Sequence, residues 1–137
     1  MRRKIKILKW SLLAGAIYFW AVAFVHMLGI KVPMLFVYFN VPSYLYQDRI
    51  IAFLSFGWAM FLYSGFVGVK RSIIWPVKYI LLAGAGAITG LSVINMSTNF
   101  SSLCKNVYYP FFWVETIFLF GYLVLLTILY CDTNNYK

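Results

Sequence analysis

The sequence predicts an all-α integral membrane protein, a bundle of four transmembrane helices with both termini on the cytoplasmic side. The 137 residues are 64% hydrophobic and only 11% charged, whereas charged residues make up about 25% of ordinary soluble domains. Four apolar stretches are each long enough to cross a bilayer, and basic residues flank them. A soluble protein of this size has too little interior for so much apolar surface. We therefore expect a single transmembrane domain over residues 1–137 with the lipid bilayer as its partner.

Charged residues divide the chain into four stretches of about the 20 apolar residues that a transmembrane helix needs. We expect spans at about residues 10–30, 50–69, 73–94 and 108–130. Lys78 lies near the start of the third span, where its long side chain can reach the headgroups. The chain lacks the alternation of apolar and polar residues that a membrane β-barrel requires, so we exclude a sheet.

The first span also has features of a secretory signal peptide. Basic residues precede it, and Ala21-Val22-Ala23 resembles a cleavage site. The apolar run continues past this point to Ile30, however, and reaches the length of a full span. We therefore expect this segment to stay in the protein as a transmembrane helix.

Lys and Arg are distributed unequally between the two ends of the predicted helices. Nine of the twelve lie on the side of the termini: Arg2, Arg3, Lys4, Lys6, Lys9, Lys70, Arg71, Lys78 and Lys137. Lys31, Arg49 and Lys105 lie on the other side. Cytoplasmic segments carry the excess of basic residues, so we place both termini in the cytoplasm, and the short loops favour a bacterial inner membrane. The net charge of +9 does not indicate nucleic-acid binding, because the basic residues form no single patch.

The two outer connections differ in polarity. The segment 31–49 is apolar and aromatic, and Pro33 and Pro42 argue against one continuous helix. We expect it to lie in the outer membrane interface or to fold over the mouth of the bundle. The other connection is polar and contains glycosylation-type triplets that begin at Asn95 and Asn99. Both triplets lie very near the membrane, so we expect neither to be used.

Small residues in the third span predict close helix packing. Membrane helices associate where small side chains let their backbones approach, because apolar side chains gain little by leaving lipid. The third span contains Gly86-x-x-x-Gly90, preceded by Gly84, and weaker pairs of small residues end at Gly15 and Gly68. We predict that the third helix is the most central one and that its glycines pack inside the chain. The alternative is a contact surface for a partner protein or a second copy.

Four ionisable residues are predicted to gather near the outer surface, where they form a candidate ligand site. His26 and Glu115 lie at comparable depth in the first and fourth spans, so the sequence allows a hydrogen bond between them. Asp48 and Arg49 open the second helix at the same surface. The proposed roof of this cluster is aromatic and consists of Tyr38, Tyr44 and Tyr46. The alternative is a structural His–Glu contact with a helix cap and an interfacial ion pair.

Several kinds of chemistry are disfavoured by the residue inventory. Bis-histidine haem needs two histidines and zinc needs three or four ligands, whereas the chain has one histidine. Cys104 and Cys131 lie at opposite faces in the predicted topology, so no disulfide is expected between them. No nucleophile with its base can be assembled, and no phosphate-binding loop is present. Small multidrug transporters have four helices and similar size, but their coupling acid lies in the first helix, where this chain has none. We predict no metal and no cofactor.

Two classes of function remain. The first is a non-catalytic accessory or assembly subunit of a membrane complex, favoured by the small size, the scarcity of reactive groups and the abundant aromatic surface. The second is a small transporter or a binder of a lipid-like or quinone-like molecule, with its site around His26 and Glu115. An enzyme that acts on a lipid is a distant third.

Overall fold

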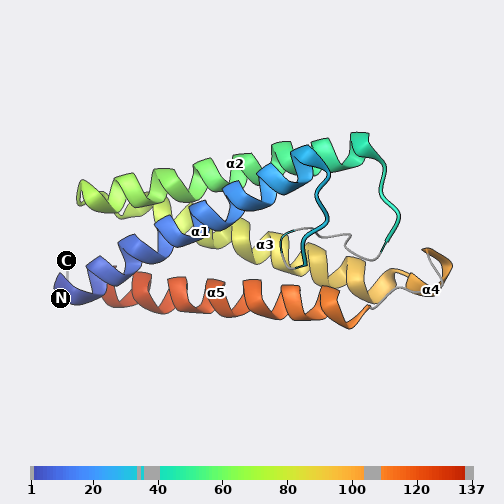
Figure 1. Cartoon of the computed structure of the whole chain (residues 1–137). Coiled ribbons are helices and arrows are strands. Elements are labelled where there is room, and N and C mark those ends of the chain that lie inside the picture. Colours follow the sequence, from blue (N-terminus) through green and yellow to red (C-terminus); the bar gives the residue numbers. More distant parts are fainter. Residues whose placement is uncertain (1, 34, 36–40, 104–108, 135–137) are drawn as a thin grey trace.

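A computed structural model describes residues 2–33, 35, 41–103 and 109–134 of the protein. The described residues form five helices and no strand. They are α1 (Arg2–Leu28), α2 (Leu45–Lys70), α3 (Trp75–Ser97), α4 (Phe100–Leu103) and α5 (Pro110–Asn134), shown in Figure 1. All except α4 are long and apolar enough to cross a membrane. The predicted all-α bundle with four long apolar helices is confirmed.

The helix ends follow from the local sequence. α1 begins at Arg2, so the basic segment adds helical turns before the predicted span. It ends before Gly29, whose φ of +68° is a conformation that glycine adopts without strain. α2 begins at Leu45, ahead of its predicted start, with the carboxylate of Asp48 in its favourable first turn. α3 has Pro76 in its first turn, where proline's missing N–H costs little.

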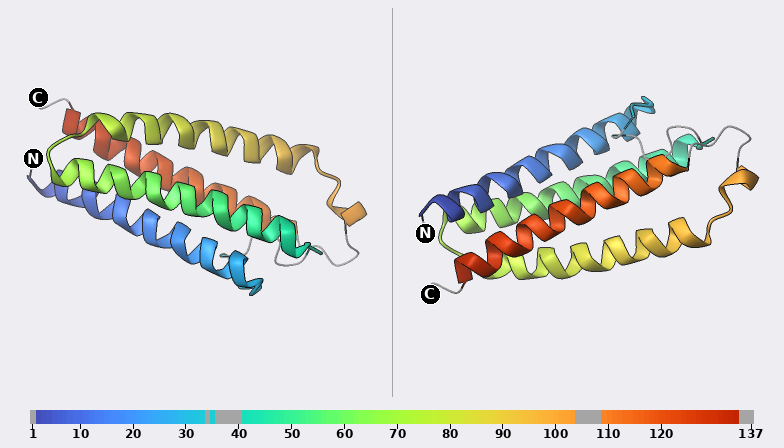
Figure 2. Two further views of the ribbon diagram at one scale, coloured as in Figure 1. Left: turned by 90° about the horizontal axis from the view of Figure 1, so that it is seen from above. Right: turned by 90° about the horizontal axis from the view of Figure 1, so that it is seen from below.

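The four long helices form a ring in the order α1, α2, α3, α5. α1 and α3 each pack against α2 and α5, and within the described chain neither diagonal pair is in contact. Figures 1 and 2 show that α1 begins beside the end of α5 and then crosses toward α2. The start of α1 and the end of α5 therefore lie at one end of the bundle, which we call the terminal end. The opposite end, where α1 stops and α2 starts, we call the loop end.

The hydrophobic core lies toward the terminal end. All four long helices contribute to it, and its buried residues are Leu8, Leu12, Ala16, Leu62, Val69, Val77, Ile80, Leu126 and Leu129. Two glycines of α2 bring α3 close: a Cβ atom at Gly65 would lie 2.5 Å from Ile80 Cδ1, and one at Gly68 would lie 2.9 Å from the Ile73 carbonyl oxygen. The terminal end is thus closed by close packing.

Toward the loop end the buried polar contacts join the helices in two pairs. The pair α1/α2 buries small residues of α2, such as Ala52 and Ala59, and holds His26 next to Asp48. The pair α3/α5 is joined by Asn95, whose Nδ2 donates to Thr116 Oγ1 at 2.9 Å. The bundle therefore consists of a core at the terminal end and two helix pairs beyond it.

The third long helix, α3, is the least buried of the four, so the prediction that it is the most central is wrong. In its apolar stretch 11% of the residues are buried, against 39% in α1. The core is filled mainly by leucines, and the small residues of α3 contribute little volume to it. In lipid, apolar residues are not driven to the centre by water, so small size alone did not determine which helix is enclosed.

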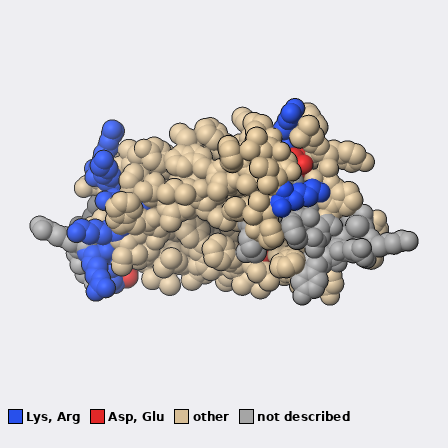
Figure 3. All heavy atoms as spheres, in the orientation of Figure 1, with Lys and Arg blue, Asp and Glu red and all other residues tan. Residues whose placement is uncertain are grey.

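Basic residues mark the two ends of the bundle. Figure 3 shows Lys and Arg at both ends of the visible face, with an almost uncharged belt between them. At the terminal end Lys4 Nζ lies 2.7 Å from Asp132 Oδ2, which links the start of α1 to the end of α5. This charge pattern matches a bundle whose long sides face hydrocarbon and whose ends face headgroups and water.

Candidate functional site

A buried histidine and a buried aspartate face each other between α1 and α2 at the loop end. His26 is 0% exposed and Asp48 is 4% exposed. His26 Nδ1 lies 3.9 Å from Asp48 Oδ1, which is too long for a hydrogen bond, and the two groups form an ion pair only when His26 is protonated. The sequence predicted that both residues lie near this surface, but it paired His26 with Glu115.

The carboxylate of Asp48 is only partly satisfied by its neighbours. Its Oδ2 accepts a hydrogen bond of 3.1 Å from Ser43 Oγ, whereas its Oδ1 accepts none from the described residues. Its place in the first turn of α2 supplies part of the missing stabilisation, because the positive end of the helix dipole lies there. The pair can therefore stabilise a charge or a proton, and it joins α1 to α2.

The other members of the predicted cluster lie apart from this pair. Arg49 is exposed, and Tyr44 and Tyr46 are 76% and 75% exposed, so neither ring covers the pair. Tyr38 lies outside the described residues. The described residues of this cluster do not gather into one pocket. Their use in ligand binding stays a prediction.

Glu115 occupies a different place, on α5 facing α1. It is partly buried, and Phe118 and Leu119, three and four residues later on the same helix face, line a groove against α1. Among the described residues the ion pairs are His26–Asp48 and Lys4–Asp132, and none joins Glu115 to His26. The two ionisable groups that the sequence analysis combined are thus divided between the α1/α2 and α1/α5 contacts.

Of the predicted packing glycines, Gly84 lies against α5. A Cβ atom there would lie 2.9 Å from Leu123 Cδ1, whereas one at Gly86 or Gly90 would meet no described atom within 4 Å. The glycines of the weaker pairs pack inside the bundle: Gly15 lies against Tyr122, and Gly68 against the α2–α3 turn. A packing role for Gly86 and Gly90 therefore requires something beyond the described chain.

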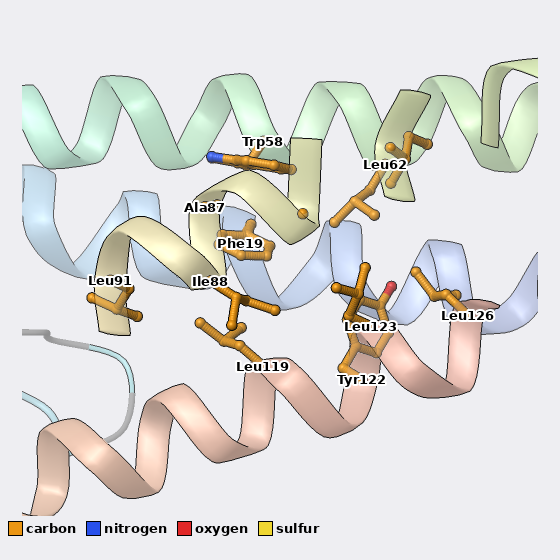
Figure 4. A pocket seen from close by; sticks show the side chains of 12 residues that line it. Phe19, Trp58, Leu62, Ala87, Ile88, Leu91, Leu119, Tyr122, Leu123 and Leu126 are labelled. Atoms are coloured by element: carbon orange, nitrogen blue, oxygen red, sulfur yellow. The ribbon is translucent and has the colours of Figure 1, made fainter. Parts of the chain in front are cut away.

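An apolar cavity of about 160 Å³ lies in the middle of the bundle. All four long helices line it, and Figure 4 shows side chains from each of them around it, among them Phe19, Trp58, Ile88 and Leu119. The rings of Phe19 and Trp58 stack with centroids 6.1 Å apart. The sequence did not predict this cavity. The only feature of the sequence that indicates it is the presence of small residues in α3 opposite bulky aromatic residues.

The hydroxyl group of Tyr122 at this cavity is already hydrogen-bonded. Tyr122 lines it, but its hydroxyl donates a 2.9 Å hydrogen bond to the Ser11 carbonyl oxygen. A cavity of about 150 Å³ with such a lining is large enough for benzene and stays free of water. The cavity therefore suits hydrocarbon and not a polar ligand.

A second apolar groove, of about 130 Å³, lies between α1 and α5. Its lining includes Ala14, Gly15 and Tyr18 of α1 and Phe118 and Leu119 of α5. Phe118 is 57% exposed, and the ring centroids of Tyr18 and Phe118 lie 6.2 Å apart. Part of the groove lining is thus exposed to the medium around the bundle.

The described residues bring no three potential metal ligands together. Cys131 at the end of α5 is a free, exposed thiol, whereas Cys104 lies outside the described residues.

The fold and these sites define the class of the protein. Four apolar helices, charged ends and an uncharged belt make it a small multi-pass α-helical membrane protein. Comparison with protein-family models, curated proteins and solved structures finds no match to the chain.

Proposed function

We propose that the protein is a non-catalytic accessory or assembly subunit of a membrane complex, and that α3 provides the surface on which a partner's transmembrane helix packs. The observation that carries the proposal is the outward position of Gly86 and Gly90 on the least buried helix. Glycine in a helix interior costs about 1 kcal/mol relative to alanine. Inside the described chain, no close packing offsets that cost at either position.

The geometry of the α3 face fits helix association in lipid. Ala83, Gly86 and Gly90 follow one side of the helix at helical spacing, and all three are exposed. They span about 10 Å along the axis at 1.5 Å per residue. Small residues at this spacing let a second helix approach closely enough for backbone contact. The partner is a membrane protein or a second copy of this chain.

Photocrosslinking in native membranes tests this proposal. A photoreactive residue at position 86 or 90 should form a defined adduct, because the partner helix lies in contact there. Gly57 of α2 and Gly121 of α5 are matched controls, since a Cβ atom at either also meets nothing within 4 Å. Equal crosslinking from positions 57, 86 and 121 would contradict a partner surface on α3. The mass of the adduct distinguishes a second copy from another protein.

The orientation and compartment belong to the same proposal. The exposed basic residues Arg3, Lys4 and Lys6 lie at the terminal end, together with Lys70 and Arg71. By the rule that cytoplasmic segments are rich in Lys and Arg, this end faces the cytoplasm. The short connections between helices fit a bacterial inner membrane.

The central cavity favours a second candidate function, a small transporter or a binder of a lipid-like or quinone-like molecule. The cavity holds about 160 Å³ and is enclosed by four helices at mid-length, where the surrounding medium is hydrocarbon. Ala87→Phe should fill the space from α3. If the cavity holds such a molecule, the amount of lipid or quinone that remains with the purified protein should fall, whereas Gly121→Phe should leave it unchanged.

A further inference from the structure

The groove between α1 and α5 has an acidic group at one end. Glu115, Phe118, Leu119 and Tyr122 are spaced by three and four residues, so they share one face of α5. The last three line the groove, and Tyr18 lies on its α1 side. Glu115 therefore lies at the loop end of an apolar groove that continues toward the middle of the bundle.

The carboxylate of Glu115 has no compensating partner in the described chain. It takes part in neither of the ion pairs, and no described side chain donates a hydrogen bond to it. It lies about 8 Å along α5 from the start of that helix, at 1.5 Å per residue. An ionised carboxylate at this depth is unfavourable unless an opposite charge or a proton is supplied.

We infer that the α1/α5 groove binds a single-chain lipophilic amine, with its protonated amino group on Glu115 and its hydrocarbon chain along Ala14, Phe118 and Leu119. The distance from Glu115 to Tyr122 along the helix is about 10 Å, which suits one extended alkyl chain. A bulky two-chain lipid is too large to be fully enclosed in a groove of about 130 Å³.

Charge, aromatic content and orientation support the same ligand class. The ammonium group compensates the Glu115 carboxylate, and the groove contains the aromatic rings of Tyr18 and Phe118, a side-chain type to which cations are attracted. The charged head lies nearer the loop end and the chain points to the bilayer centre, as for any amphiphile in a leaflet. This site is independent of the partner surface proposed on α3 and involves different helices.

Photolabelling with a dodecylamine that carries a diazirine in its chain tests the inference in the full-length protein in lipid nanodiscs. Labelled peptides should come from α1 and α5, and unlabelled dodecylamine should compete, whereas dodecanol should not. Glu115→Gln should reduce this labelling by at least about tenfold, because it removes the charge that holds the amine. Asp132→Asn is the matched control: Asp132 is an acid on the same helix, already paired with Lys4, and its loss should leave labelling unchanged.

A second variant keeps the test decisive if Glu115→Gln fails to fold. Ala14→Phe retains the carboxylate but fills the groove from its exposed α1 side, so it should also abolish labelling. Competition by dodecanol equal to that by dodecylamine, or full labelling of a folded Glu115→Gln protein, would overturn the inference. Either result would show that the groove takes any hydrocarbon chain. These outcomes do not affect crosslinking from position 86 of α3. The groove proposal and the α3 partner-surface proposal can therefore be contradicted independently.

Discussion

At the scale of single residues, His26 and Asp48 form a buried pair of ionisable groups between α1 and α2. Both side chains are almost fully buried, and each contributes a polar atom to a gap of 3.9 Å between α1 and α2. Removal of one member of a buried pair leaves the other without compensation, and this costs about 3–5 kcal/mol. Exposed pairs contribute only about 0–1 kcal/mol.

Asp48→Ala is therefore expected to lower the free energy of unfolding by about 3 kcal/mol. Asp132→Ala, which breaks the exposed Lys4–Asp132 pair, should cost less than about 1 kcal/mol. Unfolding in mixed micelles followed by circular dichroism measures both. Replacement of His26 and Asp48 together by leucine should recover much of the loss. Equal stability of Asp48→Ala and the wild type would show that the pair does not join the helices.

Two glycines in similar sequence settings should respond oppositely to alanine. A Cβ atom at Gly68 would lie 2.9 Å from the Ile73 carbonyl oxygen, which is backbone and cannot move away easily. Gly68→Ala should therefore destabilise the protein by about 1–3 kcal/mol. At Gly86 a Cβ atom meets nothing within 4 Å, so Gly86→Ala should be neutral or stabilise by up to about 1 kcal/mol through helix propensity. Paired unfolding curves would contradict this account if the two changes had the same sign.

At the scale of elements, two hydrogen bonds from Asn95 Nδ2 join α3 to α5, one to Thr116 Oγ1 and one of 3.3 Å to the Phe112 carbonyl oxygen. Asn95 Nδ2 donates to Thr116 Oγ1 at 2.9 Å, and that hydroxyl also donates to the Phe112 carbonyl oxygen. Thr127 makes the same contact within its own helix, to Leu123, but is exposed. Of these two threonines, Thr116 therefore has a hydrogen bond to another helix and Thr127 does not.

Thr116→Val should destabilise the bundle by about 0.6 to 1.7 kcal/mol, the range of interhelical hydrogen bonds in membranes. Thr127→Val is nearly the same chemical change without the interhelical partner and should cost less. The same mixed-micelle unfolding assay compares them. If Thr127→Val were as destabilising as Thr116→Val, the bond to Asn95 would contribute nothing to the α3/α5 contact.

The helices could be predicted from the sequence because span length and hydropathy are local properties. All four spans were found, and differences at their ends arose where flanking segments such as Arg2–Lys9 continue the helix. The lateral packing could not be predicted in the same way. Gly86-x-x-x-Gly90 indicates that a helix can approach closely there, but not which helix does, so α3 was placed at the centre.

The candidate site was predicted only in part, for a related reason. The positions of His26, Asp48 and Glu115 along their helices placed all three near one surface of the membrane. Position along a helix does not determine which neighbouring helix a residue meets in the bundle. α1 crosses from α5 to α2, so His26 meets Asp48 at the loop end while Tyr18, two turns earlier, lines the groove against α5. The central cavity results from the arrangement of four helices and leaves no pattern in any one of them.

At the scale of the whole molecule, the distribution of charge over the two ends predicts the orientation in the membrane. The start of α1 and the end of α5 are held together by the Lys4–Asp132 pair at 2.7 Å, so the two termini must lie on the same side. Basic residues of the α2–α3 turn lie at this end too. Cys131, which is free and exposed near the end of α5, reports on the side that this end faces.

In a Cys104→Ser background, Cys131 should react with a membrane-impermeant maleimide only after the cells are permeabilised, because segments rich in Lys and Arg are usually retained in the cytoplasm. A control cysteine at position 46, replacing an exposed tyrosine at the loop end, should react in intact cells. Substituting the basic residues before Trp10 with glutamine should weaken this preference and make part of the Cys131 population reactive from outside. Reaction of Cys131 in intact cells with the natural N-terminal charges would show the opposite orientation and place the α1/α5 groove in the cytoplasmic leaflet.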